Sequence, residues 1–238
     1  RTSKIIDTVS PLLVDAEPDV RLCICDLLIS LAKIDSSLDL VAKCISDMNA
    51  TSPMEVDDLD YVTIIDAYAK IDADFFNKSS EQHMMIILSQ SLYNMSSQEL
   101  TLTDSARNLL CSFVEFAASI LCQEASAHSD IGKEVSKPDA SWTGDRVLWI
   151  MNKFILKHIG DAVNRGISSG KGEILLIRKM VITLAYAGNL AAFRRLCSED
   201  NEVDFFKNVF SIQAHRRAKA TKRFAKVIKD SSVPVPEE

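Results

Sequence analysis

The dominant pattern along the chain is helical, because apolar residues return every three or four positions and no stretch alternates polar with apolar residues. The clearest stripe consists of Val20, Ile24, Leu27, Leu28, Leu31 and Ile34. Similar stripes occur within residues 109–120, 147–159 and 174–184. We therefore expect an all-α chain, with helices near residues 2–14, 18–34, 37–48, 58–71, 81–95, 103–123, 143–167, 172–187, 190–198 and 203–229.

These helices fall into pairs with short links, and a weak repeat accompanies them. Asp19 and Arg21 open one apolar helix; the arginine returns 86 residues later at Arg107 and again 39 residues further at Arg146. HEAT and armadillo units repeat every ~40–47 residues. We predict one HEAT/armadillo-like α-solenoid over residues 1–238, made of about five stacked antiparallel helix pairs. The chain begins without a methionine, and we expect it to be part of a larger protein.

Two links are longer than the others. Residues 49–57 contain a proline and two acids, and residues 123–141 are polar, aperiodic and nearly free of large apolar side chains. A polar stretch without periodicity is typical of a loop, so we predict a mobile surface loop over residues 123–141.

Charge is divided unevenly along the chain. Residues 1–130 hold 21 acidic and 8 basic side chains, whereas residues 131–238 hold 12 and 19. The basic excess is concentrated in the predicted long helix 204–229, which from Phe205 to Lys229 carries eight Lys or Arg residues and no acid. Such a segment calls for a partner of opposite charge, unless it is simply a solvated face.

A helical wheel divides this segment into two faces. The proposed partner-binding face consists of Arg216, Lys219, Lys222, Arg223 and Lys226, with Lys229 beside it. The apolar face consists of Phe206, Phe210, Phe224 and Ile228, with Arg217 nearby as a structural anchor. RNA phosphate, an acidic protein surface and plain solvent all remain open as the environment of the basic face.

The sequence contains no recognisable catalytic or metal-binding motif. Cys23 and Cys25 are separated by one residue rather than the spacing of a zinc site, and the acids near Asp58 lack calcium-loop spacing. The Gly170-Lys171-Gly172 turn lacks the spacing of a phosphate-binding loop. We expect no enzyme activity, metal, cofactor, small-molecule substrate or membrane span, and we interpret the six cysteines as reduced residues of an intracellular protein.

The segment from Asp204 to Ala220, DFFKNVFSIQAHRRAKA, closely resembles the pattern D-F-F-x-N-[IV]-x-H-I-Q-x-H-R-R-x-R-A of the DRIM family, a large HEAT-repeat component of the small-subunit processome. It departs from that pattern at Ser211 and Lys219. The resemblance assigns structural roles to a set of motif residues, namely Asp204, Phe205, Phe206, Asn208, Ile212, Gln213, His215 and Arg217.

This resemblance implies a non-catalytic scaffold in the nucleus and nucleolus, acting in pre-rRNA processing and small ribosomal subunit biogenesis. The implied partners are pre-rRNA or small nucleolar RNA, and other processome proteins. The alternative is a HEAT-repeat protein-interaction scaffold, for example in transport or trafficking, with no RNA role.

Overall fold

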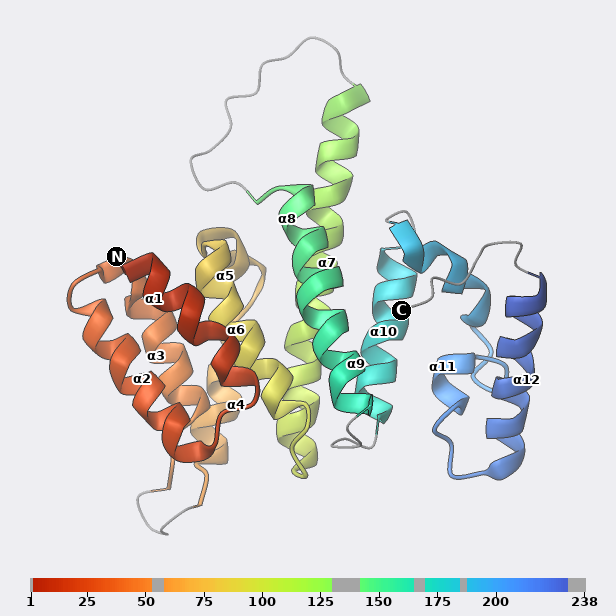
Figure 1. Ribbon diagram of the computed structural model, residues 1–238, viewed down its shortest axis with the longest axis horizontal. Helices are drawn as coiled ribbons and strands as arrows, with labels where there is room; N and C mark the ends of the chain where they lie inside the picture. The colour runs from red at the N-terminus through yellow and green to blue at the C-terminus, as the bar shows by residue number, and fades with distance from the viewer. Residues whose placement is uncertain (1, 53–57, 130–141, 165–169, 185–187, 231–238) are drawn as a thin grey trace. The chain divides into compact units, whose positions relative to one another are not determined.

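The computed structural model describes residues 2–52, 58–129, 142–164, 170–184 and 188–230. These residues form helices throughout, and the only strand-like pairing among them is an isolated antiparallel bridge between Thr51 and Leu59 (Figure 1). The all-α prediction is confirmed. The chain divides into two compact units, residues 1–159 and residues 160–238. That both belong to one continuous solenoid stays a prediction.

Unit 1 is a stack of helices that pack as neighbouring pairs. It contains α1 (Thr2–Val9), the 3₁₀ helix η1 (Ser10–Val14), α2 (Pro18–Ala32), η2 (Ser36–Leu38), α3 (Asp39–Met48), α4 (Tyr61–Ala69), α5 (Ala73–Lys78), α6 (Glu81–Asn94), α7 (Leu100–Ser129), α8 (Gly144–Trp149), the π-helical turn η3 (Ile150–Ile155) and the start of α9 (Leu156–Asn164). η1 packs on α6, α2 on α3, and α6 on α7. Unit 2 continues with α10 (Lys171–Thr183), the 3₁₀ helix η4 (Gly188–Leu196), α11 (Phe205–Asn208) and α12 (Ala214–Asp230).

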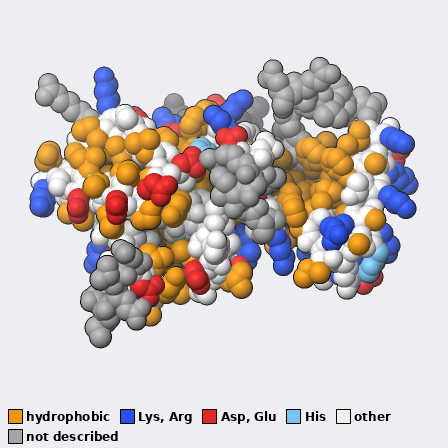
Figure 2. All heavy atoms as spheres, turned by 60° about the horizontal axis from the view of Figure 1, so that its bottom comes forward, with side chains coloured by type: hydrophobic (Ala, Val, Ile, Leu, Met, Phe, Trp, Pro, Cys, Tyr) orange, Lys and Arg blue, Asp and Glu red, His pale blue; other side chains and the backbone are white. Residues whose placement is uncertain are grey.

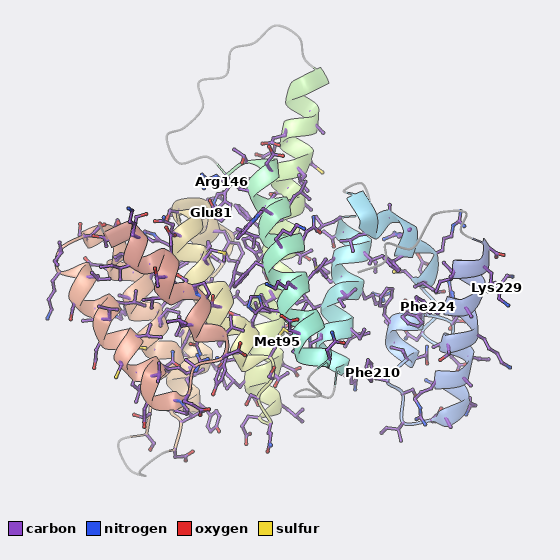
Figure 3. All side chains as sticks on the ribbon, in the orientation of Figure 1. Glu81, Met95, Arg146, Phe210, Phe224 and Lys229 are labelled. Carbon is purple, nitrogen blue, oxygen red and sulfur yellow. The ribbon has the colours of Figure 1, made fainter. Side chains whose placement is uncertain are left out.

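An aromatic cluster joins α5, α7 and the approach to α8 in the core of unit 1. The ring centroid of Phe76 lies 5.8 Å from that of Phe113 and 5.4 Å from that of Phe116. Trp142 packs edge-on against Phe113 and Phe116, and its indole N–H donates to the Phe76 carbonyl oxygen at 3.0 Å. An ion pair between Arg146 of α8 and Glu81 of α6 also links these two helices (Figure 3).

A buried arginine holds the N-terminal helices of unit 1 together. Arg21 is 2% exposed; its guanidinium donates to the carbonyls of Leu13 and Ala16 and to the Gln90 side chain, and it lies 3.2 Å from the centre of the Tyr93 ring. Burial lowers the pKa of Arg21, an effect that nearby Tyr93 partly offsets. Arg21 thus ties the end of η1 to α2 and α6.

One apolar helix could be mistaken for a membrane span. By length and composition alone, residues Leu100–Ser126 of α7 could cross a membrane. A core helix of a folded domain can have the same length and composition. The large apolar side chains of α7 are largely inside unit 1, where Phe113 and Val114 have no exposed surface. α7 therefore packs one face into the core of unit 1, and 33% of the apolar window is buried.

Two predictions about element boundaries were wrong. Helix α7 continues to Ser129, because residues 124–129 contain helix-forming Glu and Ala and neither Gly nor Pro. Residues 130–141 of the predicted 123–141 loop lie outside the described residues. The basic segment 204–229 forms two helices, α11 and α12, rather than one. Smaller differences are the extra helix α5, which Asp72 caps at the Phe75 N–H, and the 3₁₀ geometry of η4.

Candidate nucleic-acid interface

Asp204 anchors the beginning of the basic segment. Its carboxylate is fully buried and caps α11 by accepting the N–H of Lys207 at 3.1 Å. The same carboxylate accepts the N–H of Ser198 and the Nε–H of Arg178, each at 2.9 Å. Burial alone would raise the pKa of Asp204, but the hydrogen bonds from Ser198, Arg178 and Lys207 outweigh it and hold the pKa below its ordinary value.

The aromatic residues of the motif pack α11 against α12. Phe206 is 5% exposed, and the ring of Phe205 stacks on that of Phe224 with centroids 5.3 Å apart. Phe224 points towards α11 in Figure 3, whereas Lys229 points away from it. Asn208 is buried and its amide donates to the carbonyls of Asn201 and Asp204, at 2.6 and 2.7 Å. These contacts support the structural roles assigned to the first half of the motif, and the roles themselves stay a prediction.

The break between α11 and α12 has a specific set of contacts. Arg217 donates to the carbonyl oxygens of Ser211 and Ile212, at 2.7 and 2.8 Å, so its guanidinium caps the turn that precedes α12. The ring of Phe210 lies over Gly170, where φ is +72° and an added Cβ would come within 2.7 Å of the ring. Neither contact follows from a helical wheel, which explains why the sequence pattern suggested an unbroken helix.

The structure separates the predicted partner-binding residues into two groups. The two arginines lie on the side of α12 that contacts the rest of unit 2. Arg223 donates to the carbonyl oxygens of Val203, Arg195 and Cys197, and Arg216 pairs with Glu202 at 3.0 Å. Arg223 therefore secures α12 to the preceding loop, a role that its place on the basic stripe did not predict.

The lysines lie next to the arginines, on the side of α12 that faces away from the rest of unit 2. Lys219, Lys222, Lys226 and Lys229 are exposed, and at ~100° per residue they share one face of the helix, which we call the lysine face. Figure 2 shows Lys and Arg side chains gathered on this edge of unit 2. None of the four has a side-chain hydrogen bond or ion pair to another described residue. Their charges are available to an external partner.

The second half of the motif does not pack in a core. Ile212 is 97% exposed, and Gln213 and His215 are also exposed. These three side chains were predicted to be structural, but they are not buried within the described part of the chain. Ile212 instead projects from the turn that Arg217 holds.

Sequence reasoning missed two residues that shape this region. Arg178 lies beside Lys179 within the apolar pattern of α10, and a cation in such a pattern was the available signal for a buried carboxylate partner. Gly170 was predicted only to lie in a turn, yet its lack of a Cβ lets the Phe210 ring approach, at a positive φ that glycine adopts readily. Among the described residues, no group of three or more His, Cys, Asp or Glu side chains is placed to hold a metal ion.

Comparison with known proteins gives two matches. Residues 1–163 match the model of the family described as U3 small nucleolar RNA-associated protein 20, N-terminal. The chain is also 23% identical over 223 residues to the U3 small nucleolar RNA-associated protein 20 of Saccharomyces cerevisiae, and this covers 91% of the chain but 8% of that relative. The basic segment lies beyond the family-model match. Since that match spans more than half of the chain, the chain belongs to the U3 small nucleolar RNA-associated protein 20 family, as its motif predicted.

Proposed function

We propose that this chain is a non-catalytic scaffold segment of the small-subunit processome, acting in the nucleolus in pre-rRNA processing, and that it binds RNA through the lysine face of α12. Family membership supports the assembly and the process, since the yeast relative is named for its association with U3 small nucleolar RNA. The proposed ligand is pre-rRNA or small nucleolar RNA.

The lysine face is the observation that carries the RNA-binding proposal. Lysine ammonium groups attract phosphate as compact, hydrated point charges, and each phosphate they neutralise releases a condensed counterion. The two arginines beside the face already donate to groups within unit 2, so the lysines supply most of the free positive charge on α12. Contact of this kind positions RNA without reading its sequence, because phosphates carry no base information.

The test replaces Lys219, Lys222 and Lys226 with Glu and measures binding to a single-stranded RNA over a series of salt concentrations. We expect weaker binding and a shallower salt dependence, because each lost phosphate contact removes ~0.7 from the slope of log K against log salt. The matched control reverses three exposed lysines of unit 1, Lys4, Lys33 and Lys43, and should leave both quantities nearly unchanged.

The result also distinguishes this proposal from the alternative, a protein-interaction scaffold with no RNA role. Equal binding by the lysine-face variant and the unit 1 control variant would contradict the proposal. Circular dichroism should give the same helical content for both variants as for the parent chain, because exposed charges contribute little to folding. A loss of folding specific to the lysine-face variant would show instead that these lysines are structural.

A further inference from the structure

The turn of residues 211–215 is held in one conformation from both sides. Before it, the Phe210 ring sits over Gly170, and the Ser211 N–H donates to the Asn208 carbonyl at 3.0 Å. After it, Arg217 donates to the carbonyls of Ser211 and Ile212. A turn fixed in this way loses little further conformational freedom when it binds a partner.

This rigid turn presents an aliphatic side chain to solvent. Ile212 is 97% exposed, the highest value among the large apolar residues of the described chain, and neighbouring Phe210 is 41% exposed. Scattered apolar residues on a surface are normal, so exposure alone would indicate nothing. Here the exposed residue stands at the tip of a turn that four separate contacts hold in place.

The surroundings of the tip define the chemistry of its partner. Arg217 and Lys219 follow it on exposed positions, and no acid occurs between Phe205 and Lys229. An isoleucine has no π face on which a base could stack, whereas RNA recognition relies on aromatic and guanidinium planes. An apolar socket in a protein would bury the side chain, and acidic groups around that socket would complement the cations.

We propose that the 211–215 turn is a protein-docking knob, in which Ile212 enters an apolar socket rimmed by Asp or Glu on a partner protein. Lys219, a member of the lysine face, is the one residue shared with that face, and the burial of Ile212 does not depend on whether the other lysines bind RNA. This contact also gives a reason for the exposure of Ile212, Gln213 and His215 in a motif whose first half is buried.

The experiment places the photo-crosslinking residue p-benzoylphenylalanine at position 212 of the full-length protein in cells, with position 62 as the control. Val62 is 73% exposed on α4, which makes it a matched surface position in unit 1. We expect position 212 to crosslink to a protein, and the crosslinked peptide to contain apolar residues with Asp or Glu nearby. Crosslinks to RNA, or a set of products identical to that from position 62, would overturn the proposal.

The partner domain identified in this way is then purified for binding measurements. Ile212→Asp should weaken its binding about ten- to a hundredfold, the range for losing one buried isoleucine. Ile212→Val should restore most of the affinity, and RNA binding should not change in either variant. Because Ile212 is exposed, hydrogen exchange of unit 2 should be the same in both variants. Wild-type affinity of Ile212→Asp for the partner domain would contradict the proposal.

Discussion

Replacement of Asp204 by Ala should selectively destabilise unit 2. The change removes the cap of α11, which typically contributes ~1 kcal/mol, and leaves the Ser198 N–H without its partner, at a cost of about 1–3 kcal/mol. It also leaves the Arg178 guanidinium without its carboxylate; that side chain is 21% exposed, so water can partly replace the lost bond. These contributions overlap, and we expect a total loss of about 3–5 kcal/mol.

The assay is native-state hydrogen exchange resolved by peptide. Peptides covering residues 198–208 should exchange faster in Asp204→Ala, while peptides from α6 and α7 in unit 1 should serve as internal references. Glu199→Ala is the matched control, because Glu199 is an exposed acid in the same loop and its removal should change the free energy of unfolding by less than about 0.5 kcal/mol.

A loss below about 1 kcal/mol in Asp204→Ala would refute the reasoning, since that value is expected from an exposed cap alone. It would mean that the buried carboxylate does not anchor the basic segment. The distinction between anchoring residues and the free lysine face would then lose its physical basis.

Three further predictions concern both units. Arg21→Ala should reduce the stability of unit 1 by about 3–5 kcal/mol, because it leaves several buried acceptors unpaired. Urea denaturation followed by tryptophan fluorescence measures this loss, and the control Lys33→Ala should be nearly neutral. Gly170→Ala should destabilise unit 2 by about 1–3 kcal/mol, because the positive φ is strained for alanine and the new Cβ would clash with the Phe210 ring. Gly160→Ala should stabilise by up to ~1 kcal/mol, because a Cβ there meets no atom within 4 Å, and thermal unfolding compares the two variants. Because the folded-state pKa of Asp204 is lowered, its contribution should be full above its unfolded value of ~3.9 and decline as pH falls through the folded value; Asp204→Asn should remove this part of the acid dependence measured by hydrogen exchange.

The helical class and most helix positions were predictable because local periodicity determines them, but the buried face was only partly predictable. In the stripe of α2, Ile24, Leu28 and Leu31 are buried, whereas Leu27 and Ile34 are exposed. The helix presents its inner face around Arg21 and Leu28, so Leu27 at the edge of the stripe stays partly exposed, and Ile34 lies beyond the end of α2 at Ala32. A single sequence does not reveal on which side of a helix its packing partner lies.

The candidate site was predictable in charge but not in geometry. The basic stripe placed Lys219 and Arg223 together, yet only the lysine remains free, because Arg223 meets carbonyls that lie 20 or more residues earlier in the chain. The break before α12 likewise depends on Phe210 and Gly170, which are 40 residues apart. Contacts between distant residues leave no periodic signal, so the division between anchors and free cations needed the structure.

The most direct test of the central claim is RNA–protein crosslinking in intact small-subunit precursor particles, with the crosslinked residues of this protein mapped by mass spectrometry. The account predicts crosslinks to pre-rRNA or small nucleolar RNA at Lys219, Lys222, Lys226 and Lys229. It predicts none at the buried Asp204, Phe206 and Asn208. RNA crosslinks confined to other parts of the protein, with the lysine face crosslinked only to protein, would contradict it.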